Sequence, residues 1–188
     1  MSNGTSVKKR NGSIEPLNLE KIHSMCEEAC EGLAGVSASQ VEIQSGIQFY
    51  DGITTAEIQE ILIRSASDLI TLDNPNYQYV ASRLLLFSVR KSLYGRLREL
   101  PTLEAHIVDC VSQEVYDPEI YSKYSLEEIR KADGFIDHGR DFLFTYAGLR
   151  QVVDKYLVQD RSGGGVYETP QFMYCLLYTS PSPRDNLP

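Results

Sequence analysis

The alternation of apolar and polar positions predicts a mainly helical chain with a short β-hairpin near its start. Val7 to Pro16 is the predicted hairpin, because Asn11-Gly12 is the strongest two-residue turn signal. That turn would pair Lys9 with Ile14 and put Lys9 on the same face as Val7. Apolar residues then recur at helical spacing in residues 19–31, 39–48, 54–70, 74–95 and 102–134, and again from about 144 and from 170.

Capping residues mark where these helices begin. Asn18 suits the N-cap of the first helix, and Thr54 with Glu57 forms a capping box that leaves Thr55 at the first helical position. Asn74–Pro75 opens a helix that Gly95 ends. Breaks are expected within 102–134, near 117–118 and 125, and a glycine-turn hairpin is expected over 156–168. The apolar stripe expected on the first helix is Leu19, Ile22, Met25, Cys26 and Ala29.

Composition and charge narrow the class of protein. A chain of 188 residues suffices for one domain or two small ones, and its net charge of −8 argues against binding nucleic acid by bulk charge. The first 98 residues are nearly balanced, with 10 Lys/Arg and 11 Asp/Glu, so they can hold a local anion site. No apolar run reaches the roughly 20 residues that span a membrane. The first residues of the sequence lack the apolar stretch of a secretory signal peptide, so a cytoplasmic protein is expected.

The four cysteines, Cys26, Cys30, Cys110 and Cys175, include no CxxC pair, so no metal is expected on this chain. Cys26 and Cys30 are four residues apart on one helix face and are expected to be small buried residues.

Three cations of the amino-terminal region are unusual in their expected positions. Lys9 faces inward on the hairpin, and Lys21 lies in the first turn of a helix, where the dipole disfavours a cation. Arg10 follows Lys9 directly. Each feature taken singly also has an explanation without a ligand. The run Lys8-Lys9-Arg10 is typical of a charged edge strand, Thr54 and Thr55 of a helix cap, and Lys91 of the C-terminal end of a helix. Taken together, they favour an anion bound among the hairpin and the helix starts.

Several segments resemble a known family. "VKKRNGSIEPLNLEKIH", "QFYDGITTAEIQE" and "YQYVASRLLLFSVRKSLYG" resemble the ATP cone at the amino terminus of ribonucleotide reductase large subunits. "FIDHGRDFLFTYAGL", "KYLVQDR" and "VYETPQFMY" resemble the start of the catalytic region in the aerobic class I enzymes that reduce ribonucleoside diphosphates. The resemblance runs from about Val7 to Tyr174.

The resemblance implies an allosteric nucleotide-binding domain over 1–98 and an incomplete, mostly helical start of the catalytic region over 99–174. Residues 175–188 are expected to be a non-native tail. The implied effector is ATP or dATP, with magnesium. The implied partners of the intact enzyme are a radical-generating small (beta) subunit and a second large subunit, without nucleic acid or membrane. No catalytic residue is expected, because none of the four cysteines matches the family's catalytic cysteines.

The family's nucleotide site carries over residue by residue. The resemblance implies that Lys9 and Arg10 meet the phosphates, that Thr55 offers a hydroxyl, and that Lys91 adds a far-side cation. The stretch implied to wrap the nucleotide, with Glu15 and Asn18 reading the adenine, is Glu15, Pro16, Leu17, Asn18, Leu19, Glu20 and Lys21.

Three positions depart from the family pattern. Gln59 and Ser88 stand where well-known relatives carry histidines that line the site. Glu28 stands where some relatives place an aromatic residue that supports a second nucleotide, and its carboxylate would repel a second triphosphate.

Two other functions remain open on the residues alone. One is a free-standing ATP-cone regulator, although the four-cysteine zinc ribbon of such nucleotide-sensing repressors is absent. The other is a ligand-free helical interaction domain, in which the cations face solvent. Residues 137–141 are expected to form a structural polar turn, and His23 and His106 ordinary helix-face histidines.

Overall fold

The structure is a computed structural model that describes residues 5–9, 12–46, 48–160 and 165–179. Its contacts divide the chain into two compact units: a first unit of residues 1–88 and 142–150, and a second unit of 89–141 and 151–188. The fold is mainly helical with a small amino-terminal sheet, which confirms the predicted fold class. None of the helices among these residues is both long and apolar enough to cross a membrane.

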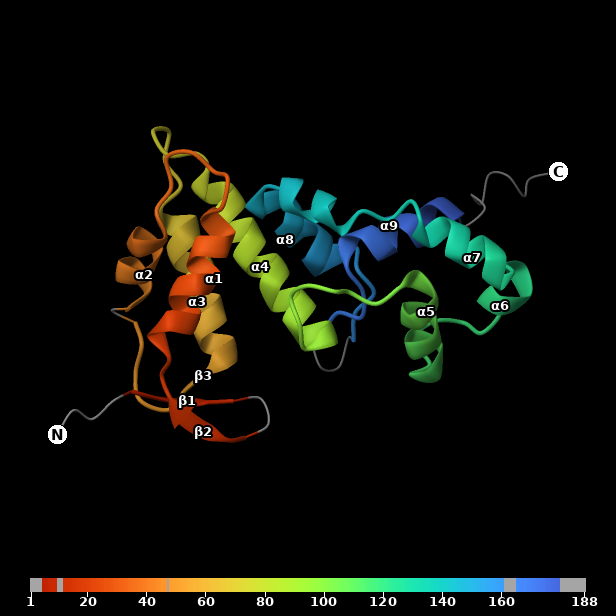
Figure 1. Ribbon diagram of the computed structural model, residues 1–188, viewed down its shortest axis with the longest axis horizontal. Helices are drawn as coiled ribbons and strands as arrows, with labels where there is room; N and C mark the ends of the chain where they lie inside the picture. Colours follow the sequence, from red (N-terminus) through yellow and green to blue (C-terminus); the bar gives the residue numbers. More distant parts are fainter. Residues whose placement is uncertain (1–4, 10–11, 47, 161–164, 180–188) are drawn as a thin grey trace. The chain divides into compact units, whose positions relative to one another are not determined.

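The first unit begins with a three-stranded sheet in the order β2-β1-β3 (Figure 1). Four helices accompany the sheet, and the last of them continues into the second unit. The elements are β1 (Ser6–Lys8), β2 (Ile14–Pro16), α1 (Leu19–Cys30), α2 (Ala38–Gly46), β3 (Ile53–Thr54), α3 (Thr55–Asp68) and α4 (Tyr77–Tyr94).

The β1–β2 hairpin forms, but its predicted register is wrong by one residue. Lys8, not Lys9, pairs with Ile14, and Val7 pairs with Glu15. Lys9 N–H donates to the Ser13 carbonyl, and Gly12 N–H donates to the Lys9 carbonyl. The bond between Lys9 and Ser13 means that three residues, not two, separate the paired positions, and Gly12 has a φ of +85°. Asn11 itself lies outside the described residues.

The register decides which side chains face the core. Val7 is buried, and Lys9, two residues on, shares its face, as predicted. Ile14 lies on the opposite face with Lys8 and is 71% exposed, contrary to the prediction.

Strand β3 was not predicted. It pairs in parallel with β1, with Ile53 opposite Val7 and Thr54 opposite Lys8. Ile53 is fully buried and follows a turn in which Gly52 has a φ of +82°. This parallel pair brings the start of α3 to the end of β1.

The core of the first unit is mainly aliphatic and includes the aromatic residues Tyr77 and Phe87. The predicted stripe of α1 is buried at Ile22, Cys26 and Ala29, as expected, whereas Leu19 is 65% exposed. The buried apolar residues of α4 include Tyr77, Val80, Ala81, Leu84, Leu85 and Phe87. The predicted caps also form, since Asn18 Oδ1 accepts from Lys21 N–H, and Thr54 and Glu57 make a reciprocal capping box.

The second unit consists of short helices, and its predicted breaks are confirmed. Arg90 and Asp141, both buried, form an ion pair of 3.0 Å. The structural interpretation of residues 137–141 is therefore supported. The elements are α5 (Leu103–Ser112), α6 (Ile120–Lys123), α7 (Leu126–Asp133), the 3₁₀ helix η1 (His138–Leu143), α8 (Tyr146–Lys155) and α9 (Pro170–Thr179), of which η1 and α8 extend into the first unit.

His106 is not a surface histidine. It is 2% exposed, stacks on Phe172 at 4.3 Å between ring centroids, and lies 3.1 Å from the Tyr116 hydroxyl. Burial lowers the pKa of His106 to about 4, so its ring is neutral near pH 7. His23 also has partners that were not predicted, since Glu42 lies 2.8 Å and Glu27 3.2 Å from its ring nitrogens.

Candidate nucleotide site

The candidate site starts from the inward face of the hairpin. Lys9 and Glu15 are diagonal neighbours on that face, and Lys9 Nζ lies 3.1 Å from Glu15 Oε2. Their side chains are 32% and 51% exposed, so both remain accessible to a ligand. The inward cation therefore has a neighbouring anion in the absence of any nucleotide.

Thr55 lies at the same end of the sheet as Lys9. Because Lys8 is opposite Thr54 in the parallel β1–β3 pair, the next residues along the two strands, Lys9 and Thr55, are also neighbours. Thr55 is half-buried and is the first residue of α3. The sheet thus places a cation and a hydroxyl at the start of one helix.

The start of α3 also holds a carboxylate. Glu57 accepts hydrogen bonds from the Thr54 hydroxyl, the Thr54 N–H and the Tyr50 hydroxyl, at 2.7 to 2.8 Å. The Thr54 hydroxyl bond, followed by the Thr54 N–H bond and the Tyr50 bond, lowers the pKa of Glu57. An anion near Thr55 would therefore share this helix end with a fixed negative charge, so attraction must come from Lys9 and its neighbours more than from the α3 dipole.

The stretch from Glu15 to Lys21 forms an accessible edge of the first unit. Leu17 is half-buried, and its N–H donates to the Thr5 carbonyl; the other six residues are exposed. Lys21 N–H donates to the predicted N-cap Asn18 at 3.0 Å, so this amide is not available to a ligand. Figure 1 shows α1 and α3 both starting next to the sheet.

The structure brings together some of the predicted residues and not others. Lys9 forms an ion pair with Glu15, and Lys9 and Thr55 directly follow the paired residues Lys8 and Thr54. Arg10 lies outside the described residues. Lys91 lies in the last turn of α4, in the second unit, and its role stays a prediction.

The structure describes the surroundings of two residues that depart from the family pattern, Gln59 and Glu28. Gln59 lies one helical turn after Thr55, is 7% exposed, and donates from Nε2 to the Leu84 carbonyl at 2.9 Å. It therefore links α3 to α4 in the interior of the first unit. Glu28, on α1, is half-buried.

The cysteines show no sign of a reactive thiolate. Burial is the main cause that raises the pKa of Cys26 to about 12 and of Cys30 and Cys110 to about 11. Burial also raises the pKa of Cys175. A nucleophilic or metal-binding thiol requires the opposite shift. Over the described ranges, no three His, Cys, Asp or Glu side chains cluster closely enough to hold a metal ion.

Residues 5–92 match the family model of the ATP cone domain, and this range covers the sheet, α1 to α3 and most of α4. The chain carries an ATP cone. It is also homologous to the amino-terminal region of ribonucleoside-diphosphate reductase alpha subunits, as the predicted resemblance indicated.

Three such relatives give the extent of this homology. The chain is 49% identical over 177 residues to ribonucleoside-diphosphate reductase 1 subunit alpha of Escherichia coli, a match that covers 94% of the chain and 23% of the relative. It is 47% identical to the alpha subunit of Haemophilus influenzae, over 96% of the chain and 24% of the relative. It is 36% identical to the alpha subunit of Helicobacter pylori, over 90% of the chain and 21% of the relative. The chain therefore spans about a quarter of the length of these reductase subunits.

The ATP cone has one structural determinant that sequence reasoning missed. Strand β3 sets the position of Thr55 beside Lys9, yet it has only two residues. The available signal was the pair of β-branched residues, Ile53 and Thr54, directly after Asp51-Gly52.

Proposed function

We propose that the ATP cone of this chain binds one purine nucleoside triphosphate, ATP or dATP, as an allosteric effector. In this proposal Lys9 and Arg10 bind the phosphates, and Thr55 donates its hydroxyl to a phosphate oxygen. Glu15 and Asn18 accept from the adenine amino group, while Pro16, Leu17, Leu19, Glu20 and Lys21 complete the wall. Lys91 supplies a further cation. Magnesium would arrive with the triphosphate, whose oxygens are its preferred ligands.

The observation that supports the proposal is that Lys9 and Thr55 directly follow the paired residues Lys8 and Thr54, and that Lys9 shares the face of buried Val7. A lysine on that face needs an anion. Glu15 supplies one at 3.1 Å, but both side chains remain partly exposed. A triphosphate carries more charge than one carboxylate and can replace it.

For the longer protein, we propose the activity of its relatives, the reduction of ribonucleoside diphosphates. The effector in the cone would then regulate an active site that lies outside the matched quarter of the relatives' length. The proposed partners are a radical-generating beta subunit and a second alpha subunit. The chain described here would bind the effector without catalysing the reaction.

Amide hydrogen exchange, followed peptide by peptide with and without MgATP, tests the effector site. The proposal predicts slower exchange in residues 12–21 and 53–57, and unchanged exchange in α5 to α7. A ligand that is bound at 100 times its dissociation constant stabilises a protein by about 2.7 kcal/mol, enough to slow exchange clearly. Protection confined to other segments, or none at saturating MgATP, would contradict the site.

A further inference from the structure

The carboxyl-terminal end of α1 is held by Arg83 of α4. Arg83 Nη1 donates to the Ala29 carbonyl at 3.1 Å and to the Glu31 carbonyl at 2.6 Å. The last carbonyls of a helix have no partner within the helix, and a cation at this end also complements the helix dipole. Arg83 therefore fixes the end of α1 with two charge-assisted hydrogen bonds.

The same guanidinium lies over an aromatic ring from a distant part of the sequence. Arg83 Cζ is 5.7 Å from the centroid of the Phe142 ring, within the range of a cation–π contact. Phe87, one helical turn after Arg83, meets the Phe142 ring edge-to-face, with centroids 6.1 Å apart. Phe142 begins the stretch 142–150, which belongs to the first unit although residues 89–141 belong to the second. Arg83 thus connects α1 to the stretch with which the chain returns to the first unit.

Helix α1 also carries part of the proposed effector site. Its N-cap is Asn18, and its first turn contains Leu19 and Lys21. Ala29 follows Lys21 by about two helical turns, or about 12 Å at 1.5 Å per residue. A helix is a rigid element, so a nucleotide that displaces or fixes its first turn also acts on the carbonyls that are bonded to Arg83.

We propose that Arg83 couples occupancy of the effector site to the position of the Phe142 ring. This inference rests on the proposed binding of a nucleotide at the start of α1. Because α1 and Phe142 share one guanidinium, a displacement of the two α1 carbonyls changes the position of the cation over the ring. Arg83 is then a positioning residue, which acts through α1 and not by contact with the effector. The coupling is reciprocal, so a change at Phe142 must also change the affinity for the effector.

Fluorine NMR tests this coupling in the chain with 4-fluorophenylalanine at its six phenylalanine positions. Phe142→Leu assigns the Phe142 signal by its loss. Saturating MgATP should shift the Phe142 signal, whereas the signals of Phe135, which is 75% exposed, and Phe172, in the core of the second unit, should not move. A Phe142 signal that does not respond in a chain that binds MgATP by calorimetry would overturn the inference and leave the effector site standing. No binding by calorimetry would overturn both.

Two variants distinguish the guanidinium from a merely structural contact. Arg83→Met keeps an aliphatic side chain without the charge, and Arg83→Lys keeps a cation that can donate to the α1 carbonyls. Arg83→Met should lose most of the shift that MgATP causes at Phe142, and Arg83→Lys should retain more of it. Equal shifts in both variants and the unaltered chain would overturn the inference. The unaltered chain gives its own result even where Arg83→Met does not fold.

A double-mutant cycle on the dissociation constant of MgATP adds a test of reciprocity. Arg83→Lys and Phe142→Leu should each change that constant by about two- to tenfold, the scale of coupling energies along such a connection. The double variant should change it no more than the stronger single variant, because both remove one shared contact. Changes that multiply in the double variant, or no change in either single variant, would overturn the inference.

Discussion

The two units differ in what fills their interiors. The first unit is packed with aliphatic side chains from α1, α3 and α4, among them Ala29, Leu62 and Leu84, which are fully buried. The second unit has a central cluster of four fully buried apolar residues, Leu103, Ile107, Ile129 and Phe172. Around that cluster it buries paired polar groups, including Arg90 with Asp141 and Tyr116 with Glu168.

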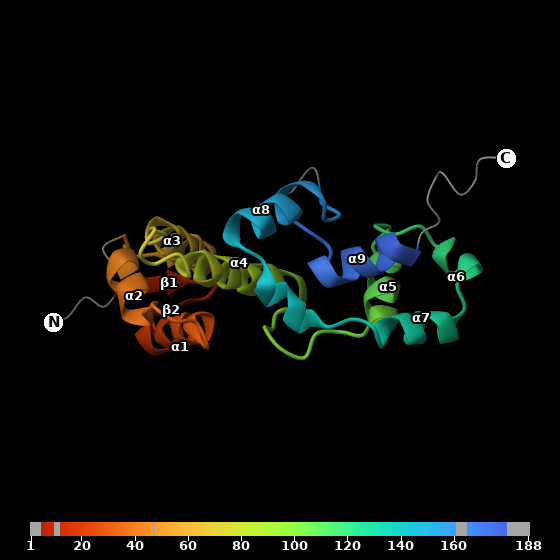
Figure 2. The same cartoon turned by 90° about the horizontal axis from the view of Figure 1, so that it is seen from above.

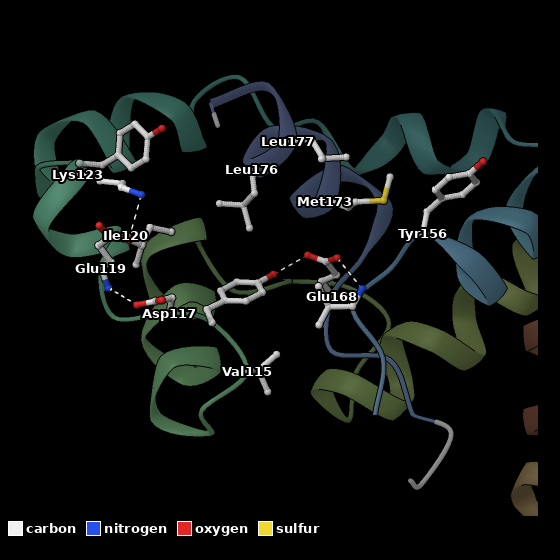
Figure 3. Close-up of a pocket in the computed structure, with 13 residues that line it drawn as sticks. Val115, Asp117, Glu119, Ile120, Lys123, Tyr156, Glu168, Met173, Leu176 and Leu177 are labelled. Atoms are coloured by element: carbon white, nitrogen blue, oxygen red, sulfur yellow. Dashed lines mark hydrogen bonds and ion pairs between the residues drawn. The ribbon is translucent and has the colours of Figure 1, made fainter. Parts of the chain in front are cut away.

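This difference predicts that the two units respond differently to the loss of a buried side chain. An aliphatic core loses stability in proportion to the volume removed, whereas a buried ion pair fails when one partner is lost. The second unit also has an open groove of about 620 Å³ between α6 and α9, lined in part by Ile120, Met173 and Leu177 (Figure 3), which is consistent with its smaller core. Figure 2 shows the elements of each unit from a second direction.

The largest expected effect is the loss of Asp141. Asp141→Ala would leave the buried Arg90 guanidinium without its carboxylate and remove the Gln171 bond at 3.2 Å. We expect the second unit to lose about 3–5 kcal/mol, the range for breaking a buried ion pair. Unit-resolved amide exchange would measure this, with the first unit unchanged. Glu104→Ala is the control, because it breaks the exposed pair with Arg130 at 2.8 Å and should cost less than about 1 kcal/mol.

A pair of leucine truncations compares the two interiors directly. Leu62 is fully buried in α3, and Leu62→Ala should cost the first unit about 2–5 kcal/mol in unfolding free energy. Leu177 is 63% exposed on the groove wall, and Leu177→Ala should change stability by no more than about 0.5 kcal/mol. Denaturant titration checks both. A loss at Leu177 as large as that at Leu62 would show that the groove is closed in solution.

The pKa values of the three histidines should be shifted in opposite directions in the two units. Burial lowers the pKa of His106 and His138, in the second unit, to about 4. A lowered pKa means that their contribution is fully present above the ordinary value of 6.5 and is lost as pH falls toward about 4. In the first unit, the hydrogen bond to Glu42, followed by the charge of Glu27, raises the pKa of His23. Its contribution is present below pH 6.5 and is lost as pH rises through its raised pKa.

Proton NMR resolves this prediction residue by residue. The His23 ring should titrate above pH 6.5, while the other two rings should stay neutral until the pH approaches 4. Ring shifts are a better readout than overall stability, because burial raises the pKa of Glu168 and Asp141 and gives their contributions the opposite sign. A midpoint near 6.5 for His106 would mean that the second unit is open to water.

The smallest expected effect concerns the carboxylate that competes for Lys9. Glu15→Gln removes the charge that lies 3.1 Å from Lys9 Nζ. Binding of inorganic tripolyphosphate, which has no base, should therefore tighten about two- to fivefold, as expected for an exposed ion pair. Glu60→Gln, on the exposed surface of α3, makes the same change in net charge and should have less effect. Equal tightening in both variants would contradict a specific role of Glu15, because the change in net charge alone would then explain the effect.

Local signals predicted most of the helices, because caps and stop residues act over a few positions. Asn18, Thr54 and Gly95 ended or started helices where expected, and α9 begins at Pro170. The hairpin register could not be fixed in this way, since both a two-residue and a three-residue loop can place Gly12 at positive φ, and only the observed pairing of Lys8 with Ile14 separates them.

Long-range pairings were less accessible from the sequence. Arg90 and Asp141 are 51 residues apart, and nothing near either one indicates the other. Strand β3 is too short to show a period of two. Of the candidate site, residue types and the inward face of Lys9 were predictable. Thr55 was assigned by resemblance, and the β1–β3 pairing that brings the start of α3 to the end of β1 required the structure.

Calorimetric titration of MgATP into the chain and its Lys8→Ala and Lys9→Ala variants tests the central claim most directly. The two lysines are adjacent, but Lys8 is exposed opposite Ile14, and Lys9 shares the face of buried Val7. The account predicts that Lys8→Ala binds MgATP nearly as the unaltered chain does, whereas Lys9→Ala loses most of its binding. Equal binding by the two variants, or a greater loss in Lys8→Ala, would contradict it.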